Sequence, residues 1–196
     1  MSKNKNNKPI WNTRINKNSN NLFKKIGGSL QVDKRLFNED IEGSIVHVEM
    51  LFKQKIINFK IKNKIVWGLN RIRNEIIKKK FKFNENLEDI HMNIENRLFE
   101  LIGEDAGFIH TARSRNDQIV TDFKIWLKKG TNEINKNLNI TINNILKIAN
   151  KNVETIMPGF THLKNAQPVS FAHYLLAYVE MFTRDKKRFN NNLENL

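Results

Sequence analysis

At 196 residues the chain is long enough for one domain and the beginning of a second, and its formal net charge at pH 7 is +14. It contains no cysteine, which excludes disulfide bonds and thiolate metal sites, and no apolar run approaches the roughly 20 residues that cross a bilayer. We therefore expect a soluble cytoplasmic protein that is not attached to a membrane.

The positive charge comes mostly from lysines that are scattered along the chain beside abundant asparagine and isoleucine. No glycine-rich or aromatic-interleaved basic motif of the kind found in RNA-binding modules accompanies them. Nucleic-acid binding is therefore a minor alternative, which would show an affinity that falls steeply with salt. We expect no nucleic-acid partner.

Residues 1–20 are rich in lysine and asparagine and lack the apolar core of a secretory signal. This composition is typical of a flexible basic tail that becomes ordered only against a partner. Gly27-Gly-Ser29 follows, just ahead of the first predicted helix. Two glycines allow a close approach of the backbone to a ligand, and Ser29 could donate a hydrogen bond to an anion, although a plain turn is the simpler interpretation.

Apolar residues spaced three or four apart predict three helices, over residues 38–59, 64–80 and 87–102. Glu88 and Asp89 suit the positive end of the third helix, and Gly103 suits its C-terminal cap. A fourth helix, over residues 114–153, would span on the order of 60 Å. So long a helix with one apolar stripe needs partners along its length, which a helical bundle or an oligomer supplies.

Pro158-Gly159 ends the fourth helix, and we expect a polar loop as far as Pro168, which is placed to open a last helix over residues 169–196. No strand-like alternation or hairpin turn signal competes with these helices. We therefore predict an all-α fold. An N-terminal helical domain over residues 21–113 is followed, over residues 114–196, by the opening long helices of a central helical bundle, truncated at the last residue.

The segment Thr111–Gln118 carries the first candidate site. Every residue in it except Ala112 is polar, and two are arginines. Arginine forks and the hydroxyl and amide donors beside them suit a carboxylate at the positive end of a helix, which Ser114 or Asn116 could cap. An ordinary helix cap with salt bridges to Asp117 or Asp105 fits the segment equally well.

The second candidate is His162, which lies between the two long helices and directly after Thr161. A histidine there can act as general acid or base, although a structural histidine is the commoner case. The same scepticism applies to His47, His91, His110 and His173. None of these histidines forms an HxxxH or HExxH pair and the acidic residues form no ligand cluster, so we predict no metal site.

Together these segments resemble the argininosuccinate lyase family of the fumarase/aspartase superfamily. The resemblance runs from about Trp11 to the last residue, and the run from His110 to Gln118 is its most specific part. The matching segments, in order, are Asp33-Lys-Arg-Leu36, Asp40-Ile-Glu-Gly-Ser44, Glu88-Asp-Ile-His-Met92, Gly107-Phe-Ile-His110, Thr111-Ala-Arg-Ser-Arg-Asn-Asp-Gln118, Pro158-Gly-Phe-Thr-His-Leu163 and Ala166-Gln-Pro168.

The resemblance implies cleavage of argininosuccinate to arginine and fumarate, the last step of arginine biosynthesis, by a β-elimination without cofactor. In this reaction a base removes a proton next to a carboxylate, hydrogen-bond donors hold the resulting dianion, and the guanidinium nitrogen departs. It further implies that His162 is the acid/base residue, that Ser29, Asn116 and Thr161 contact the substrate, and that Ser114, Arg115 and Asp89 support the substrate-binding site.

The resemblance also implies a homotetramer whose active sites are each assembled from three subunits. The third motif of the family, a Gly-Ser-Ser loop followed by Met-Pro-Gln-Lys-Lys-Asn-Pro, does not occur in these 196 residues. We therefore expect an N-terminal portion of the enzyme that is inactive by itself. The alternatives are a non-catalytic truncated subunit, a structural helical protein, or another lyase of the superfamily such as adenylosuccinate lyase.

Overall fold

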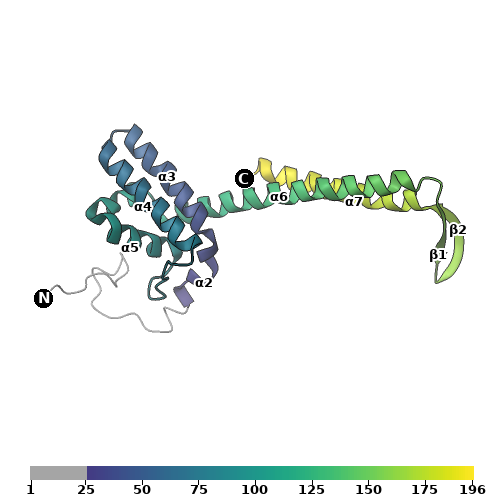
Figure 1. The fold of residues 1–196 in the computed structure, drawn as a ribbon, viewed down its shortest axis with the longest axis horizontal. Helices are drawn as coiled ribbons and strands as arrows, with labels where there is room; N and C mark the ends of the chain where they lie inside the picture. Colours follow the sequence, from purple (N-terminus) through teal and green to yellow (C-terminus); the bar gives the residue numbers. More distant parts are fainter. Residues whose placement is uncertain (1–25) are drawn as a thin grey trace. The chain divides into compact units, whose positions relative to one another are not determined.

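The computed structural model describes residues 26–196, so the predicted basic tail over residues 1–20 lies outside the described residues. Helices dominate, as the all-α prediction requires, and one small sheet is added. The elements, in chain order, are α2 (Leu30–Asp33), η2 (Lys34–Leu36), α3 (Phe37–Lys53), α4 (Phe59–Ile77), α5 (Ile90–Ile102), η3 (Gly103–His110), α6 (Arg115–Lys151), β1 (Ile156–Thr161), β2 (Lys164–Ser170) and α7 (Phe171–Glu194) (Figure 1). None of the helices among the described residues is long and apolar enough to span a membrane.

The chain divides into two compact units, which we call unit 1 (Met1–Ile125) and unit 2 (Trp126–Leu196). The division falls inside α6. The first three turns of this helix therefore belong to unit 1, and the remainder belongs to unit 2.

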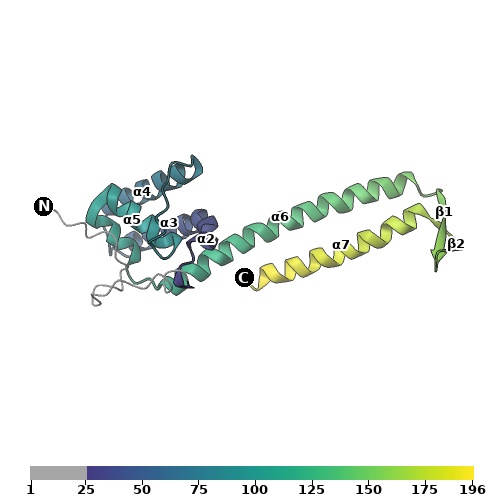
Figure 2. The ribbon, with the colours of Figure 1, turned by 90° about the horizontal axis from the view of Figure 1, so that it is seen from below.

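Unit 1 is built on α3, α4 and α5, which lie side by side in both ribbon views (Figures 1 and 2). Its core consists of aliphatic side chains that these three helices bury at the helical spacing expected from the sequence. Those with no measurable exposure are Ile41, Val48, Leu51, Ile65, Leu69, Ile72, Ile90 and Leu98. Gly68 lets α4 approach α5 closely, since a Cβ atom on it would lie 2.4 Å from Leu98 Cδ1.

The boundary between the first two helices differs from the prediction. The helix expected over residues 38–59 ends at Lys53, and the next begins at Phe59 rather than at residue 64. Lys55 adopts a left-handed conformation with φ 59°, which no helix accommodates. The side chain of Asn58 then caps α4 by accepting a hydrogen bond from the Ile61 amide at 2.9 Å. The apolar spacing continues through this turn, so spacing alone could not locate it.

The C-terminal end of α5 agrees with the prediction, while its first residue, Ile90, lies three residues after the predicted start at residue 87. Asp89 is its N-cap, where Oδ1 accepts a hydrogen bond from the Met92 amide at 2.6 Å. Gly103 is its C-cap, with φ 71°, a conformation that favours glycine.

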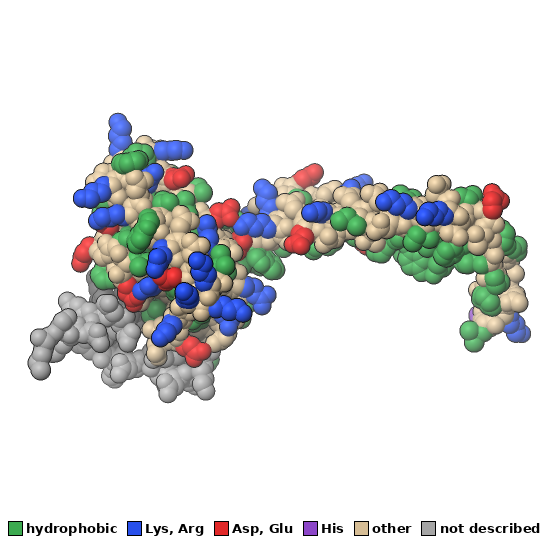
Figure 3. All heavy atoms as spheres, in the orientation of Figure 1, with side chains coloured by type: hydrophobic (Ala, Val, Ile, Leu, Met, Phe, Trp, Pro, Cys, Tyr) green, Lys and Arg blue, Asp and Glu red, His purple; other side chains and the backbone are tan. Residues whose placement is uncertain are grey.

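Unit 2 is a helical hairpin in which the second part of α6 runs antiparallel to α7 (Figure 2). Asn135 Nδ2 on α6 donates to Asn190 Oδ1 on α7 at 2.8 Å. The apolar residues that this unit buries are small or medium-sized, namely Ala149, Ala172 and Val179. Many larger ones stay exposed, and Figure 3 shows hydrophobic side chains gathered along one side of the two helices. Two helices alone therefore do not cover their apolar faces.

The polar loop expected between the two long helices is instead a β-hairpin. Its strands are antiparallel, Thr161 pairs with Lys164, and His162 and Leu163 form the turn. Both turn residues are left-handed, with φ 48° and 64°, as a tight two-residue hairpin turn requires. The sequence lacks the asparagine or glycine that usually signals such a turn, which is why the hairpin escaped prediction.

The expected helix start at Pro168 is also wrong. Pro168 lies in β2 opposite Pro158, and α7 begins at Phe171 after its N-cap Ser170. Both strands of a two-stranded sheet are edge strands, where a proline without an N–H is tolerated.

Candidate functional site

Ser29 lies against the N-terminal end of α5. Its amide donates to the Glu88 carbonyl at 2.8 Å, and its hydroxyl donates to Asp33 Oδ2 at 2.6 Å. Asp33 in turn accepts a hydrogen bond from the Ile90 amide at 3.2 Å through its other oxygen. The glycine-serine segment and the head of the third helix, which are about 60 residues apart in the sequence, therefore meet at one place.

Arg115 connects this place to the start of α6. Its Nε lies 3.7 Å from Asp89 Oδ2, and its Nη2 lies 3.0 Å from Glu95 Oε2. Its Nη1 donates to Gln118 Oε1 at 2.7 Å. Salt bridges at this segment were one of the two interpretations of the sequence, but the partners are on α5. Asp105 pairs instead with Lys64 at 2.6 Å.

The turn before α6 is fixed by contacts with α3. Arg113 Nη1 donates to Ser44 Oγ at 2.8 Å, and His47 Nε2 lies 2.9 Å from the Thr111 carbonyl oxygen. Ser114 Oγ accepts a hydrogen bond from the Asn116 amide at 3.3 Å, so Ser114 caps the helix. The side chains of Ser114 and Asn116 remain exposed at the positive end of a 37-residue helix. Such an end suits a carboxylate.

Behind Arg115 lies a cluster of buried polar residues that the sequence interpretation missed. Gln118 Nε2 donates to Asp40 Oδ1, and His91 Nδ1 lies 3.0 Å from the same oxygen and 3.5 Å from Asp122 Oδ2. Asp40, His91 and Asp122 are at most 1% exposed. Among the described residues, no donor serves either carboxylate oxygen of Asp122.

The protonation states of the cluster follow from burial and from mutual charge. Burial, together with the negative charge of Asp40, raises the pKa of Asp122 to about 8. Burial also disfavours the charged forms of Asp40 and His91, but their hydrogen bond and attraction outweigh it. The pKa of Asp40 is therefore lowered and that of His91 raised.

These shifts favour a negative Asp40, a positive His91 and a protonated Asp122, a set of charges that needs no metal ion to balance it. The three side chains nevertheless form the one group of described residues that could hold such an ion, since one donor atom from each lies within 4.8 Å of the others. No ligand cluster was expected from the sequence, because these residues come from three different helices.

Thr161 and His162 belong to unit 2, at the tip of the hairpin, and both are exposed. A left-handed non-glycine residue costs of order 1–3 kcal/mol, and such strain concentrates at functional sites. Two of them occur in succession here, at His162 and Leu163, and Leu163 is 98% exposed. Packing against described residues does not explain the choice of leucine. The remaining predicted site residues (Ser29, Asp89, Ser114, Arg115 and Asn116) all belong to unit 1.

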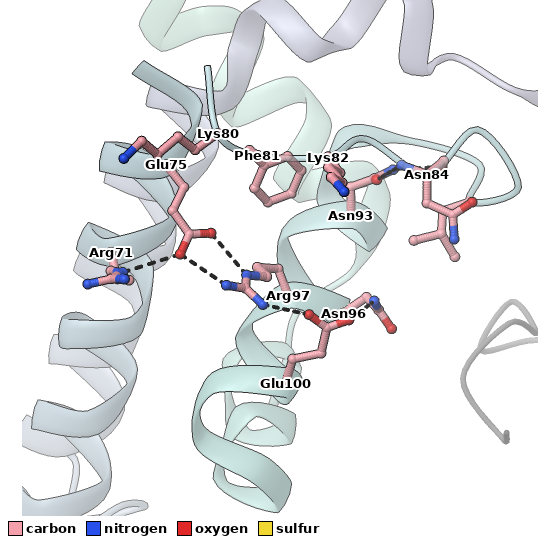
Figure 4. Close-up of a pocket in the computed structure, with 11 residues that line it drawn as sticks. Arg71, Glu75, Lys80, Phe81, Lys82, Asn84, Asn93, Asn96, Arg97 and Glu100 are labelled. Atoms are coloured by element: carbon pink, nitrogen blue, oxygen red, sulfur yellow. Dashed lines mark hydrogen bonds and ion pairs between the residues drawn. The ribbon is translucent and has the colours of Figure 1, made fainter. Parts of the chain in front are cut away.

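A separate pocket of 430 Å³ lies between α4 and α5 (Figure 4). Glu75 in this pocket accepts hydrogen bonds from both Arg97 and Arg71, and Arg97 also binds Glu100 at 2.8 Å. The hydrogen bonds from Arg97 hold the pKa of Glu75 below its usual value. The pocket contains none of the predicted site residues, and its central charges are paired with one another. We interpret it as a structural ion-pair network.

Comparisons with known proteins identify the family of the chain. A family model described as lyase matches residues 13–196. An argininosuccinate lyase of Pelagibacter ubique is 68% identical over all 196 residues, and one of Ehrlichia canis is 47% identical over 93% of the chain. The chain spans 42% and 39% of the lengths of these relatives. A solved EDDS lyase variant with bound fumarate has a similar fold, with a TM-score of 0.69 and 24% identity, over 80% of this chain and 30% of its own.

Proposed function

Because the chain belongs to the lyase family whose model matches residues 13–196, we propose that the protein cleaves argininosuccinate to arginine and fumarate. The observation that carries the proposal is the start of α6, where Ser114 and Asn116 are exposed at the positive helix end while Arg115 is anchored to α5. Relatives named argininosuccinate lyase support the choice of substrate within the family.

The proposed chemistry is a β-elimination. A base removes a proton from the carbon next to a carboxylate, and the electron pair moves into that carboxylate to give a dianion. The carbon–nitrogen bond then breaks, the departing guanidinium nitrogen takes up a proton, and fumarate is left. Negative charge grows as the first proton is removed, so preorganised donors around the dianion supply much of the acceleration.

We assign proton transfer to His162 and contacts with the substrate to Ser29, Asn116 and Thr161. The exposure of these side chains supports a role in binding a ligand. Ser114, Arg115 and Asp89 are assigned to the support of the site. The contact of Ser114 with the Asn116 amide and that of Arg115 with Asp89 favour this role.

We further propose that the protein acts as a homotetramer with active sites at contacts between subunits. The exposed apolar faces of α6 and α7 support this assembly, because two helices alone cannot cover them. No metal or cofactor is required by the proposed reaction.

The proposal can be tested by offering argininosuccinate, fumarate with ammonia, and adenylosuccinate to the protein produced from its full reading frame. We expect fumarate release from argininosuccinate. Release of fumarate from adenylosuccinate alone would overturn the assignment in favour of another lyase of the superfamily.

The role of His162 makes a sharper prediction. Replacing it by asparagine (His162→Asn) should lower kcat by about 100-fold or more, because general acid–base catalysis contributes about that much. The matched control is His173→Asn, since His173 is an exposed histidine on α7 outside the assigned site. If His162→Asn and His173→Asn have equal kcat, His162 does not transfer a proton in the reaction.

A further inference from the structure

We propose that Gln118, with the buried residues Asp40, His91 and Asp122 behind it, is a positioning residue that holds Arg115 and the turn at residues 111–116 in their substrate-binding arrangement. This inference rests on the proposed function for its catalytic meaning. The positioning itself can be tested independently of catalysis.

The guanidinium of Arg115 contacts only acceptors of this chain among the described residues. Each of its three nitrogens faces a different acceptor, in Gln118, Glu95 and Asp89, at 2.7, 3.0 and 3.7 Å respectively. Its side chain is 22% exposed, so little of the fork is available to a ligand. Arg115 therefore fixes the first turn of α6 against α5, and the exposed groups on either side of it, Ser114 and Asn116, are placed by that anchor.

Gln118 connects Arg115 by hydrogen bonds to the buried cluster. It is 3% exposed, its oxygen accepts from Arg115, and its nitrogen donates to Asp40 Oδ1. The two partners together determine the orientation of the amide, because exchanging its oxygen and nitrogen would place a donor against an arginine and an acceptor against a carboxylate.

The residues behind Gln118 join three helices. Asp40 belongs to α3, His91 to α5, and Asp122 to α6 one turn beyond Gln118. Buried ionic groups are weak evidence for stability, since apolar residues of similar volume often serve equally well. A register role fits them better, because the Gln118–Asp40 hydrogen bond and the approach of His91 to Asp40 and Asp122 require one relative placement of the three helices. The network thus fixes the position of α6 relative to α3 and α5. Gln118, which is held by Asp40, in turn fixes the position of the Arg115 guanidinium through their hydrogen bond.

The test compares the variant Gln118→Met with the wild type and with Gln54→Met, in the protein produced from its full reading frame. Methionine keeps the volume of glutamine and removes both hydrogen bonds. Gln54 is an exposed glutamine at the end of α3, which makes it the matched control. Hydrogen exchange over residues 111–118 is measured by mass spectrometry, and kcat/KM is measured with argininosuccinate.

We expect Gln118→Met to accelerate exchange over residues 111–118 and to lower kcat/KM by about tenfold or more, because small misplacements of positioned groups are costly. Gln54→Met should change neither. If Gln118 acts through Arg115, the double variant with Arg115→Met should have the kcat/KM of Arg115→Met alone. Additive losses, or unchanged exchange in the segment, would overturn the inference.

Two outcomes of this experiment need a second measurement. If Gln118→Met does not fold, Arg115→Met breaks the same link from its more exposed side and should accelerate exchange in the same segment, and unchanged exchange would refute the positioning. If the wild type does not cleave argininosuccinate, the proposed function fails, while the exchange measurement still decides whether Gln118 positions the turn.

Discussion

At the scale of single residues, the turn of the hairpin is held in a conformation that its side chains disfavour. His162 and Leu163 both have positive φ, which glycine or asparagine would adopt at lower cost. A turn selected only for stability would use those residues. We interpret the strain as a cost of presenting His162 at the tip.

This interpretation predicts a gain in local stability for Leu163→Gly. The substitution relieves the strain at φ 64° and should stabilise the hairpin by about 1 kcal/mol. Amide exchange in residues 156–170 should slow about fivefold as a result, since local opening becomes less frequent. Faster exchange in Leu163→Gly would show that the leucine stabilises the turn.

Asp122 makes a second prediction, about pH. Its pKa is about 8 in the folded protein and near 3.8 when unfolded, so between these values the folded state keeps a proton that the unfolded chain has lost. Stability from this group is therefore present at low pH and lost as pH rises towards 8. The raised pKa of His91 acts in the same direction above its usual value of 6.5. The lowered pKa of Asp40 matters only below 3.8.

We therefore expect the Tm of the wild type to fall between about pH 4 and pH 8, and that of Asp122→Asn to fall less, because asparagine stays neutral. Asp105→Asn is the control, since Asp105 lies in a surface pair with Lys64. If Tm falls equally with pH in the wild type and in Asp122→Asn, Asp122 is not protonated in the folded protein.

The sequence contains a signal for the buried polar residues of α3 and α6, which is their position within the apolar stripes. Asp40 and Ser44 continue the stripe of Val48 on α3, at intervals of four residues. Gln118 and Asp122 are likewise four apart on α6. A polar residue at a core position of an apolar stripe indicates a buried partner, but the identity of that partner depends on which helices meet. The candidate anion-binding segment and the candidate acid/base histidine could be proposed from the sequence, because their residue types suit that chemistry and their order along the chain resembles that of a known family.

At the scale of elements, the long helices were predictable and the connections between them were not. α6 keeps one apolar stripe over 37 residues, so its bounds agree with the prediction to within a few residues. The turn between α3 and α4 and the hairpin depend instead on single residues, Lys55 and Leu163, whose left-handed conformations their types do not suggest. Propensity and spacing carry no information about such positions.

The contact between α4 and α5 gives a prediction at this scale. Gly68→Ala should destabilise the protein by about 1–3 kcal/mol, because the new methyl group overlaps Leu98, which is completely buried and cannot retreat easily. Gly130→Ala is the matched control on α6, where no atom lies within 4 Å of the position that a Cβ atom would take. It should stabilise by about 0.5–1 kcal/mol through helix propensity. Denaturant unfolding that gives both changes the same sign would contradict the close approach of the helices.

At the scale of the whole molecule, unit 2 contains many large apolar side chains that its own two helices leave exposed. On α6 the exposed or half-buried residues Ile134, Ile145 and Ile148 lie on one side at helical spacing, and on α7 Tyr174, Tyr178 and Met181 do the same. Burying one such aliphatic side chain is worth about 2 kcal/mol. An assembly that covers both stripes therefore gains a large free energy, which supports the proposed homotetramer.

The assembly can be tested by placing charges on this side of α6. We expect Ile134→Asp combined with Ile148→Asp to reduce the mass measured by light scattering below that of the wild type, because an unpaired buried carboxylate costs several kcal/mol. Asn132→Asp adds one of the same charges on the opposite side of the helix, where Asn132 is exposed, and should leave the mass unchanged. If the active sites lie at subunit contacts, the double variant should also lose activity in proportion to its dissociation. A double variant that keeps the wild-type mass would place the contacts between subunits elsewhere.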